Sequence, residues 1–193
     1  MKTAHLSVFI VLCINVVSAS ARSVAAKAAT TLPNILFILA DDLGYGDVRC
    51  YNAESKVPTP NIDRLASGGV RFTDAHSPCT VCTPSRYALM TGQMAFRVPR
   101  GGTVFQGVGG PSLIAPGRLT LPAMLKQQGY ETAAVGKWHI GLTFRNKAGE
   151  PIHSGRLEDV QRVDYSRRIE GGPLDHGFER FFGTACCPAT DWL

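Results

Sequence analysis

Four ionisable side chains stand where two apolar runs of the sequence end. Asp41 and Asp42 directly follow the first run, and Lys137 and His139 follow the second. In open α/β sheets ligands bind just beyond the carboxyl ends of the strands, so these groups are predicted to meet at one edge of a sheet. Carboxylates suit a hard cation such as Ca²⁺ or Mg²⁺, and the ammonium and imidazole suit an anion. A simple turn or helix cap is the competing interpretation of the two adjacent acids.

Cys79 and Cys82 have a Cys-x-x-Cys spacing, for which a disulfide, a redox pair and half of a metal knuckle are the three general interpretations. A zinc knuckle needs a second pair of ligands, and the chain has neither another Cys-x-x-Cys nor a His-x-x-x-His. A redox pair would need a thioredoxin-like unit, which nothing else in the sequence supports.

Calcium takes about six to eight oxygen ligands, so Asp41 and Asp42 alone cannot complete its shell.

Cys82 also lies at the beginning of a predicted helix over residues 84–90, which Gly92 ends. The free N–H groups and the positive end of a helix dipole attract anions, and Arg86 adds a fixed positive charge one turn further on. This arrangement favours a site for a tetrahedral oxyanion.

The elements that must position these residues have the pattern of an α/β protein. The continuous apolar run 35–40 predicts a strand covered on both faces, typical of a parallel sheet. A helix is predicted over 60–66, with Thr59 as its cap and Pro60 at its first position, and a short strand over 70–73. Residues 98–117 are rich in Gly and Pro and predict a long surface loop.

The second half of the chain repeats the helix and strand order. Thr120 is predicted to cap a helix over 121–128, which Gly129 closes, and a second buried strand is predicted over 131–136. This order implies right-handed crossovers and a mostly parallel sheet. The polar stretch from Gly141 to Gly172 has no clear periodicity and predicts irregular structure.

The N-terminus has the features of an export signal. Residues 1–21 combine an early Lys, a short apolar run and a small-x-small cleavage site, which predicts a signal peptide followed by a flexible lead-in over 22–32. An anchoring helix is the alternative, but the run is shorter than the roughly 20 apolar residues needed to cross a bilayer. The chain is therefore expected to be secreted or periplasmic, without stable membrane insertion. The predicted domain covers 33–193.

Composition excludes one class of partner. The formal net charge is +5, with no Lys/Arg block and no stacking pattern of aromatic residues, so nucleic acid is not an expected partner. Five cysteines remain after residue 21, and in an oxidising compartment this odd number leaves at least one without a disulfide.

The segment Cys82–Gly92, CTPSRYALMTG, resembles the signature of the sulfatase family, in which the cysteine is converted to Cα-formylglycine. Further segments resemble family motifs in the same order, and they are 33–44, 59–66, 136–141 and 177–183. The resemblance implies an alkaline-phosphatase-like α/β fold and a hydrolase of sulfate esters. A sulfated small molecule or polysaccharide is the implied substrate, and a formylglycine-generating enzyme is the implied maturation partner.

Carried over residue by residue, the resemblance makes Asp41, Asp42 and the modified Cys82 ligands of Ca²⁺. Cys82, as formylglycine, would be the nucleophile. One hydroxyl of its hydrate would attack sulfur and release the alcohol, and the other would lose its proton and expel sulfate.

The resemblance also implies roles for three further side chains. Arg86 would hold the formylglycine, Lys137 would bind the sulfate, and His139 would hydrogen-bond the formylglycine hydroxyl. With Ca²⁺, the two cations would stabilise charge on the transferring group. Cys79 would be left to a structural role, with Cys50 or a cysteine outside residues 1–193 as its disulfide partner.

The chain departs from the family in one respect. Members use a later Asp-Asn or Asp-Gln pair, and a further His and Lys, that have no counterpart before Leu193. We therefore expect an N-terminal part of a sulfatase that is inactive or poorly folded alone. A hydrolase of phosphonates or phosphate diesters and a non-catalytic calcium- or glycan-binding protein are the alternatives.

Overall fold

The computed structural model describes residues 32–97, 110–152 and 157–186. Residues up to Ile35 form one unit and Leu36–Leu193 another, and nearly all of the described residues belong to the second. The predicted signal peptide, the lead-in except Leu32, and Cys187 lie outside the described residues. Within the described part of the chain, no helix is both long and apolar enough to cross a membrane.

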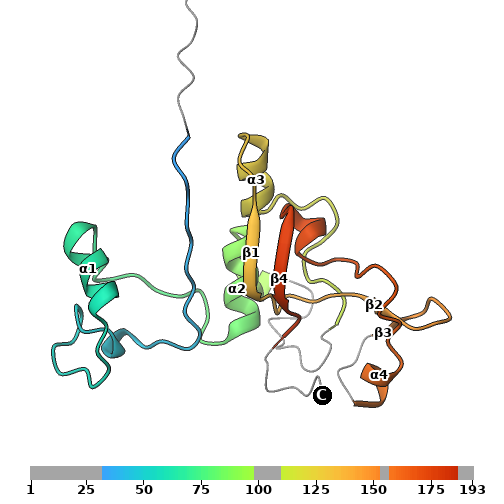
Figure 1. Cartoon of the computed structure of the whole chain (residues 1–193), viewed down its shortest axis with the longest axis horizontal. Helices are drawn as coiled ribbons and strands as arrows, with labels where there is room; N and C mark the ends of the chain where they lie inside the picture. Colours follow the sequence, from blue (N-terminus) through green and yellow to red (C-terminus); the bar gives the residue numbers. More distant parts are fainter. Residues whose placement is uncertain (1–31, 98–109, 153–156, 187–193) are drawn as a thin grey trace, which may run out of the picture. The chain divides into compact units, whose positions relative to one another are not determined.

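The described elements are short helices and strands joined by longer connections (Figure 1). In chain order they are η1 (Tyr45–Asp47), α1 (Pro60–Gly68), α2 (Cys82–Thr91), η2 (Ala95–Arg97), α3 (Leu121–Gln127), β1 (Ala133–Lys137), β2 (Phe144–Arg145), β3 (Pro151–Ile152), α4 (Leu157–Gln161), η3 (Pro173–His176) and β4 (Arg180–Thr184).

The helices α2 and α3 confirm the predictions made from their end signals. Helix α2 begins at Cys82 and ends before Gly92, whose φ of 64° is left-handed and whose N–H donates to the carbonyl of Ala88. Helix α3 begins after Thr120, whose hydroxyl accepts the N–H of Ala123. These local signals suffice because a cap satisfies backbone groups that the helix itself leaves unpaired.

Helix α1 also forms, with Pro60 at its first position, but the predicted capping by Thr59 is wrong. The Thr59 hydroxyl instead lies 3.1 Å from a carboxylate oxygen of Asp63 and accepts the N–H of Arg49 at 3.0 Å. The threonine therefore ties the helix to the preceding loop, and this competing bond explains why its side chain does not cap.

Strands β1 and β4 form a parallel pair, which confirms the predicted strand near 131–136 and the parallel arrangement. The register runs from Ala133 opposite Arg180 to Lys137 opposite Thr184. The predicted burial of β1 is wrong, because Val135 is 83% exposed, as is Phe182 of β4 at 82%. No other described strand pairs with either one, so this sheet has only two strands and these two side chains remain exposed.

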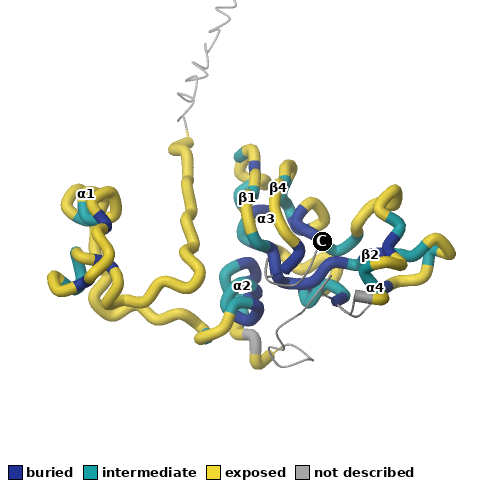
Figure 2. The backbone as a smooth tube through the Cα atoms, turned by 60° about the horizontal axis from the view of Figure 1, so that its bottom comes forward, coloured by how far each residue is buried: buried dark blue, intermediate teal, exposed yellow. Residues whose placement is uncertain are grey.

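The predicted buried strand over 35–40 is also wrong. The segment has no regular structure, and its large apolar side chains are exposed (Figure 2), with Leu36 at 84% and Ile38 at 74%. A strand is stable only when a neighbour takes its hydrogen bonds and another layer covers its faces. No described strand provides these for 35–40.

Two weaker expectations have different outcomes. The strand predicted over 70–73 is absent, since these residues have no regular structure and Val70 and Phe72 are exposed. The stretch between Gly141 and Gly172, predicted to be irregular, contains the β2–β3 hairpin and α4. In the predicted loop 98–117, the described residues 110–117 contain only turns and bends.

The hydrophobic core is centred on the segment that follows β1. Trp138, Ile140, Leu142 and Phe144 are each at most 5% exposed. They pack with buried side chains from α2 and from later segments, which are Tyr87, Met90, Ile114, Ile152, Val163 and Ala185. The best-packed part of the molecule therefore lies directly beyond Lys137.

The contact between β1 and β4 gives a prediction for stability. A Cβ atom on Gly183 would overlap the backbone carbonyl of Gly136, so Gly183→Ala must push the strands apart. We expect a loss of about 1–3 kcal/mol in the free energy of unfolding, measured by urea titration with far-UV circular dichroism. The control is Gly68→Ala in α1, where a Cβ meets nothing within 4 Å and helix propensity improves. Equal midpoints for the two variants would contradict the tight strand contact.

Candidate active site

One oxygen of Asp41 joins three parts of the chain that are distant in sequence. Its Oδ2 atom accepts hydrogen bonds from Lys137 Nζ at 2.8 Å and from Arg86 Nη2 at 2.9 Å. The three side chains are 24%, 15% and 13% exposed, respectively, so the ion pairs are partly shielded from water. The structure thus brings together a residue after 35–40, one on α2 and the last residue of β1.

The end of β1 holds Lys137 in place through backbone pairing. The hydrogen bonding to β4 continues beyond the strand, with Trp138 N–H on the Thr184 carbonyl and His139 N–H on the Ala185 carbonyl, both at 2.9 Å. Arg86 Nη1 also donates to the backbone carbonyl of Lys137. The guanidinium therefore spans from the strand end to the carboxylate, a geometry that the planar fork of arginine permits.

The two adjacent acids differ in their electrostatics. The hydrogen bond from Lys137, then those with Asp42 and Arg86, holds the pKa of Asp41 well below its usual range. The hydrogen bond with Asp41 and its negative charge raise the pKa of Asp42. The ion pairs of Asp41 are thus fully formed above the usual carboxyl pKa and are lost only as the pH falls well below it.

Cys82 occupies the first position of α2, one helical turn before Arg86, and its thiol is partly buried and free. The loop before it is fixed by two hydroxyls, because Ser77 and Ser85 donate to the carbonyl of Cys79 at 2.7 and 2.8 Å. The sequence analysis did not assign Ser77 a role, because it lies five residues before Cys82 and outside the recognised motif. Thr83, which follows Cys82, is fully buried, and its hydroxyl has no hydrogen-bond partner among the described residues.

His139 is fully buried two residues beyond Lys137. Its φ of 60° is left-handed, and it is the only described residue other than glycine with a positive φ. Such a conformation is uncommon for a side chain of this kind and is often found at functional positions. His139 thus adopts this conformation between two buried core residues, Trp138 and Ile140.

The expected disulfide between Cys50 and Cys79 is not formed in the structure, where both thiols are free. The Cys50 N–H instead donates to a carboxylate oxygen of Asp63 at 2.9 Å, so this loop is held by a polar contact. The thiol of Cys82 is likewise free, which leaves it available for chemistry other than a disulfide.

The carboxylates of Asp41 and Asp42 are donors of the kind that Ca²⁺ takes in proteins. Within the described ranges, no group of three or more His, Cys, Asp or Glu side chains gathers as a metal site. The oxygen atoms of these two carboxylates are suitable ligands for a hard cation. They provide only part of the six to eight oxygens of a calcium shell.

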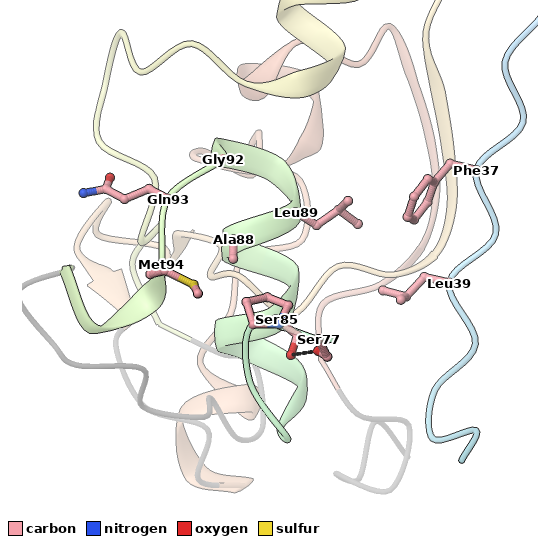
Figure 3. Close-up of a pocket in the computed structure, with 10 residues that line it drawn as sticks. Phe37, Leu39, Ser77, Ser85, Ala88, Leu89, Gly92, Gln93 and Met94 are labelled. Atoms are coloured by element: carbon pink, nitrogen blue, oxygen red, sulfur yellow. Dashed lines mark hydrogen bonds between the residues drawn. The ribbon is translucent and has the colours of Figure 1, made fainter. Parts of the chain in front are cut away.

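A cavity of about 540 Å³ lies beside α2 and apart from these residues (Figure 3). Its lining is mainly apolar and includes Phe37, Leu39, Leu89 and Met94. Figure 3 shows Phe37 and Leu39 facing α2 across the gap. None of Asp41, Cys82, Lys137 or His139 lines it, whereas Ser77 and Ser85, which hold the loop before Cys82, do.

The family model and the similar proteins of known name all belong to the sulfatases. The sulfatase family model matches residues 33–192. The chain is 38% identical over 164 residues to human steryl-sulfatase, covering 82% of this chain and 24% of that protein. It is 47% identical over 121 residues to bovine arylsulfatase A, covering 61% and 23%. To N-acetylgalactosamine-6-O-sulfatase of Bacteroides thetaiotaomicron it is 49% identical over 119 residues, covering 57% and 21%.

Solved structures support the fold. The crystal structure of Ps i-CgsB matches with a TM-score of 0.57 and 29% identity, over 78% of this chain and 27% of that one. Its complex with k-i-k-neocarrahexaose matches with a TM-score of 0.55 and 27% identity, over 76% and 27%. The predicted alkaline-phosphatase-like α/β fold is confirmed for the part present here, a parallel strand pair with helices.

The chain spans about a quarter of the length of the curated relatives that it matches. The family model nevertheless covers most of the chain, including helix α2 and the Asp41 cluster, which consists of Asp41, Arg86 and Lys137. On this match, the chain belongs to the sulfatase family.

Proposed function

We propose that this chain carries part of the active site of a sulfate ester hydrolase whose nucleophile is a formylglycine made from Cys82. The observation that carries the proposal is the meeting of Arg86 and Lys137 at Asp41, one turn from Cys82. This arrangement combines a nucleophile position at a helix N-terminus with two cations and a hard carboxylate donor. The cations and the helix N-terminus favour a bound sulfate and stabilise its charge, and the carboxylate suits a hard cation.

Each side chain has a task that follows from its position. Lys137 and Arg86 are partly buried, so their charges act on a bound sulfate more strongly than they would in water. Arg86 is fixed at two points, Asp41 and the Lys137 carbonyl, and can orient a group on Cys82 without first being ordered. His139 is fully buried two residues after Lys137, and its N–H is bound to the Ala185 carbonyl. We propose that its side chain hydrogen-bonds the hydroxyl of the modified residue.

We propose that Asp41, Asp42 and the modified Cys82 contribute to a calcium site. When bound, Ca²⁺ would supply positive charge that polarises a sulfate oxygen. Asp41 is ionised at neutral pH because its cationic neighbours hold its pKa low, so it is ready to bind a cation without losing a proton. Asp42 shares the site through its hydrogen bond with Asp41.

The substrate class is proposed from the relatives. Their names refer to steryl, aryl and N-acetylgalactosamine sulfates, and a solved neighbour is in complex with k-i-k-neocarrahexaose. We therefore propose a sulfated small molecule or polysaccharide as substrate, and a formylglycine-generating enzyme as the partner that converts Cys82.

The modification of Cys82 can be tested on one tryptic peptide, 72–86, which contains both Cys79 and Cys82. After coexpression with a formylglycine-generating enzyme, we expect mass spectrometry to show an aldehyde in place of the thiol at Cys82. Cys79, in the same peptide, is the control and should be alkylated as an ordinary thiol. Alkylation of both residues, or a Cys79–Cys82 disulfide, would contradict the proposed nucleophile.

The converted chain should then be assayed with an aryl sulfate and an aryl phosphate diester, with Cys82→Ala as background. We expect little or no turnover by the 193-residue chain, because its described carboxylates provide only part of a calcium shell. Turnover of the diester in preference to the sulfate would contradict the proposed substrate class. Turnover at rates typical of enzymes would contradict the low activity expected of the 193-residue chain.

Calcium binding should stabilise the fold. We expect Ca²⁺ at ten times its dissociation constant to raise the free energy of unfolding by about 1.4 kcal/mol, seen as a higher thermal midpoint. Asp42→Asn should remove the effect while leaving the ion pairs of Asp41 in place. Asp74→Asn is the matched control, since Asp74 is exposed and pairs with exposed His76, and its calcium response should be unchanged. An Asp42→Asn variant that responds like the parent would rule out this metal site.

We also propose that residues 1–21 direct export and are then removed, which places the chain outside the cytoplasm. The motivating pattern is the apolar run before the Ala19-Ser20-Ala21 site. N-terminal sequencing of the exported protein should begin at Arg22. Recovery of an uncleaved, membrane-bound chain would instead support the anchoring helix.

A further inference from the structure

We propose that His176, with its ring neutral, is a positioning residue that holds the segment Lys137–Gly141 at the candidate site. The inference rests on the proposed function only for the roles given to Lys137 and His139. It concerns a buried side chain outside the Asp41 cluster, on η3 rather than on β1.

The ring of His176 is fixed by a hydrogen bond and a stacking contact. Its Nε2 atom lies 2.9 Å from the hydroxyl of Ser112, and the Gly171 backbone hydrogen-bonds with the same side chain. Its plane is nearly parallel to that of Trp138, at 14°, with the ring centroids 6.2 Å apart. The residue is only 8% exposed, so these contacts replace those it would make with water.

Trp138 transmits this contact to the site because it stands between Lys137 and His139. It is 5% exposed, its indole N–H donates to the Gly141 carbonyl at 3.0 Å, and Phe178 is a further aromatic neighbour, edge-on at 6.5 Å. The indole is thus held by a polar contact and by aromatic rings on two sides. We infer that these contacts fix the backbone between Lys137 and His139.

The loop that carries Ser112 binds the same segment from the other direction. Leu113 N–H donates to the Ile140 carbonyl at 3.0 Å, and Leu142 N–H donates to the Gly110 carbonyl at 2.7 Å. The Ser112–His176 bond closes this arrangement by joining the loop to η3. Thr120 adds a third link, from its hydroxyl to the His176 carbonyl at 2.6 Å.

The neutral ring suits these contacts. If the Gly171 carbonyl accepts from one ring nitrogen, Nε2 of the neutral ring accepts from the Ser112 hydroxyl. An imidazolium would instead have to donate to that hydroxyl, which already accepts the Ile114 N–H and would turn its own proton to the Ile114 carbonyl at 3.3 Å. Burial lowers the pKa of His176 below 6.5, and Asp175 and the Gly171 backbone partly oppose this. Because the folded pKa is the lower one, the stabilisation is complete above about pH 6.5 and is lost as the pH falls through the folded value.

Few other charges act on the ring. Asp175 is its neighbour on η3 and pairs with Arg168. Residues 110–115 and 120–123, which pack nearby, contain no ionisable side chain, and the segment beneath contributes Lys137 and His139 on either side of Trp138.

A Ser–His pair is also the arrangement of a nucleophile and its base, and we considered that role. Here the Ser112 hydroxyl also accepts the N–H of Ile114 at 3.2 Å. The histidine's further contact is a backbone group, where a catalytic pair would have a carboxylate. The cavity beside α2 does not include either residue. These contacts favour positioning over catalysis.

The test compares the labelling rate of Lys137 by an amine-reactive reagent at pH 7.5, read by mass spectrometry. Lys126, which pairs with Glu179 and is 52% exposed, is the internal reference. His176→Phe keeps a stacked ring but removes the acceptor, and Ser112→Ala removes the donor. Both should raise the Lys137 to Lys126 labelling ratio several-fold. His176→Gln keeps an acceptor for Ser112 but loses the stacked ring, so it should restore the parental ratio only in part.

A second readout follows the ring's charge. In a Trp192→Phe background Trp138 is the remaining tryptophan, and its emission should fall with a midpoint below pH 6.5 as the neighbouring imidazolium forms. His176→Gln should abolish that titration.

An unchanged labelling ratio in His176→Phe or Ser112→Ala, with circular dichroism showing a folded chain, would overturn the proposal. If His176→Phe does not fold, Ser112→Ala decides, because it removes one hydroxyl and leaves the ring in place. Neither readout depends on turnover, so failure of the proposed hydrolase would leave these outcomes unchanged, and their failure would not affect the assay of Cys82.

Discussion

The shared carboxylate of Asp41 is the interaction on which the rest of the site depends. Arg86 and Lys137 are both largely shielded from water, and a shielded cation without a counter-ion is costly. Asp41 satisfies both with one oxygen, and in doing so it fixes the first turns of α2 against the end of β1. This contact also fixes the position of Cys82, because Cys82 lies on the same face of α2 one turn before Arg86.

The elements predicted well are those whose stability is local. Helices α2 and α3 begin and end where their proline, threonine and glycine signals place them, since these residues act within one turn. The motif around Cys82 and the residues at the end of β1 could likewise be found from spacing alone. The rule that parallel strands present their carboxyl ends together predicted that the acids after 35–40 would lie near Lys137. Asp41 does contact Lys137, although 35–40 is not a strand, and the contact with Arg86 did not follow from that rule. Their roles in catalysis remain proposals.

The strands were predicted less well because a strand depends on what lies beside it. The run 35–40 has the composition of a buried strand, yet no described segment pairs with it, and its side chains remain exposed. Strand β4 was missed because its five residues include Arg180 and Gly183, which interrupt the pattern. A two-stranded sheet is marginal in water, which agrees with a chain that spans about a quarter of its curated relatives.

The support of the site differs in kind from the site itself. At Asp41 three charged groups meet in a partly exposed cluster, where their charges can act on a bound anion. Behind it, the link through Ser112, His176 and Trp138 is buried and, with a neutral ring, carries no charge that would need a counter-ion. A charged group there would lower the stability of the core and alter the field at Lys137. A neutral His176 therefore allows the segment to be held without a second positive charge beside Lys137, whose ammonium is paired with Asp41.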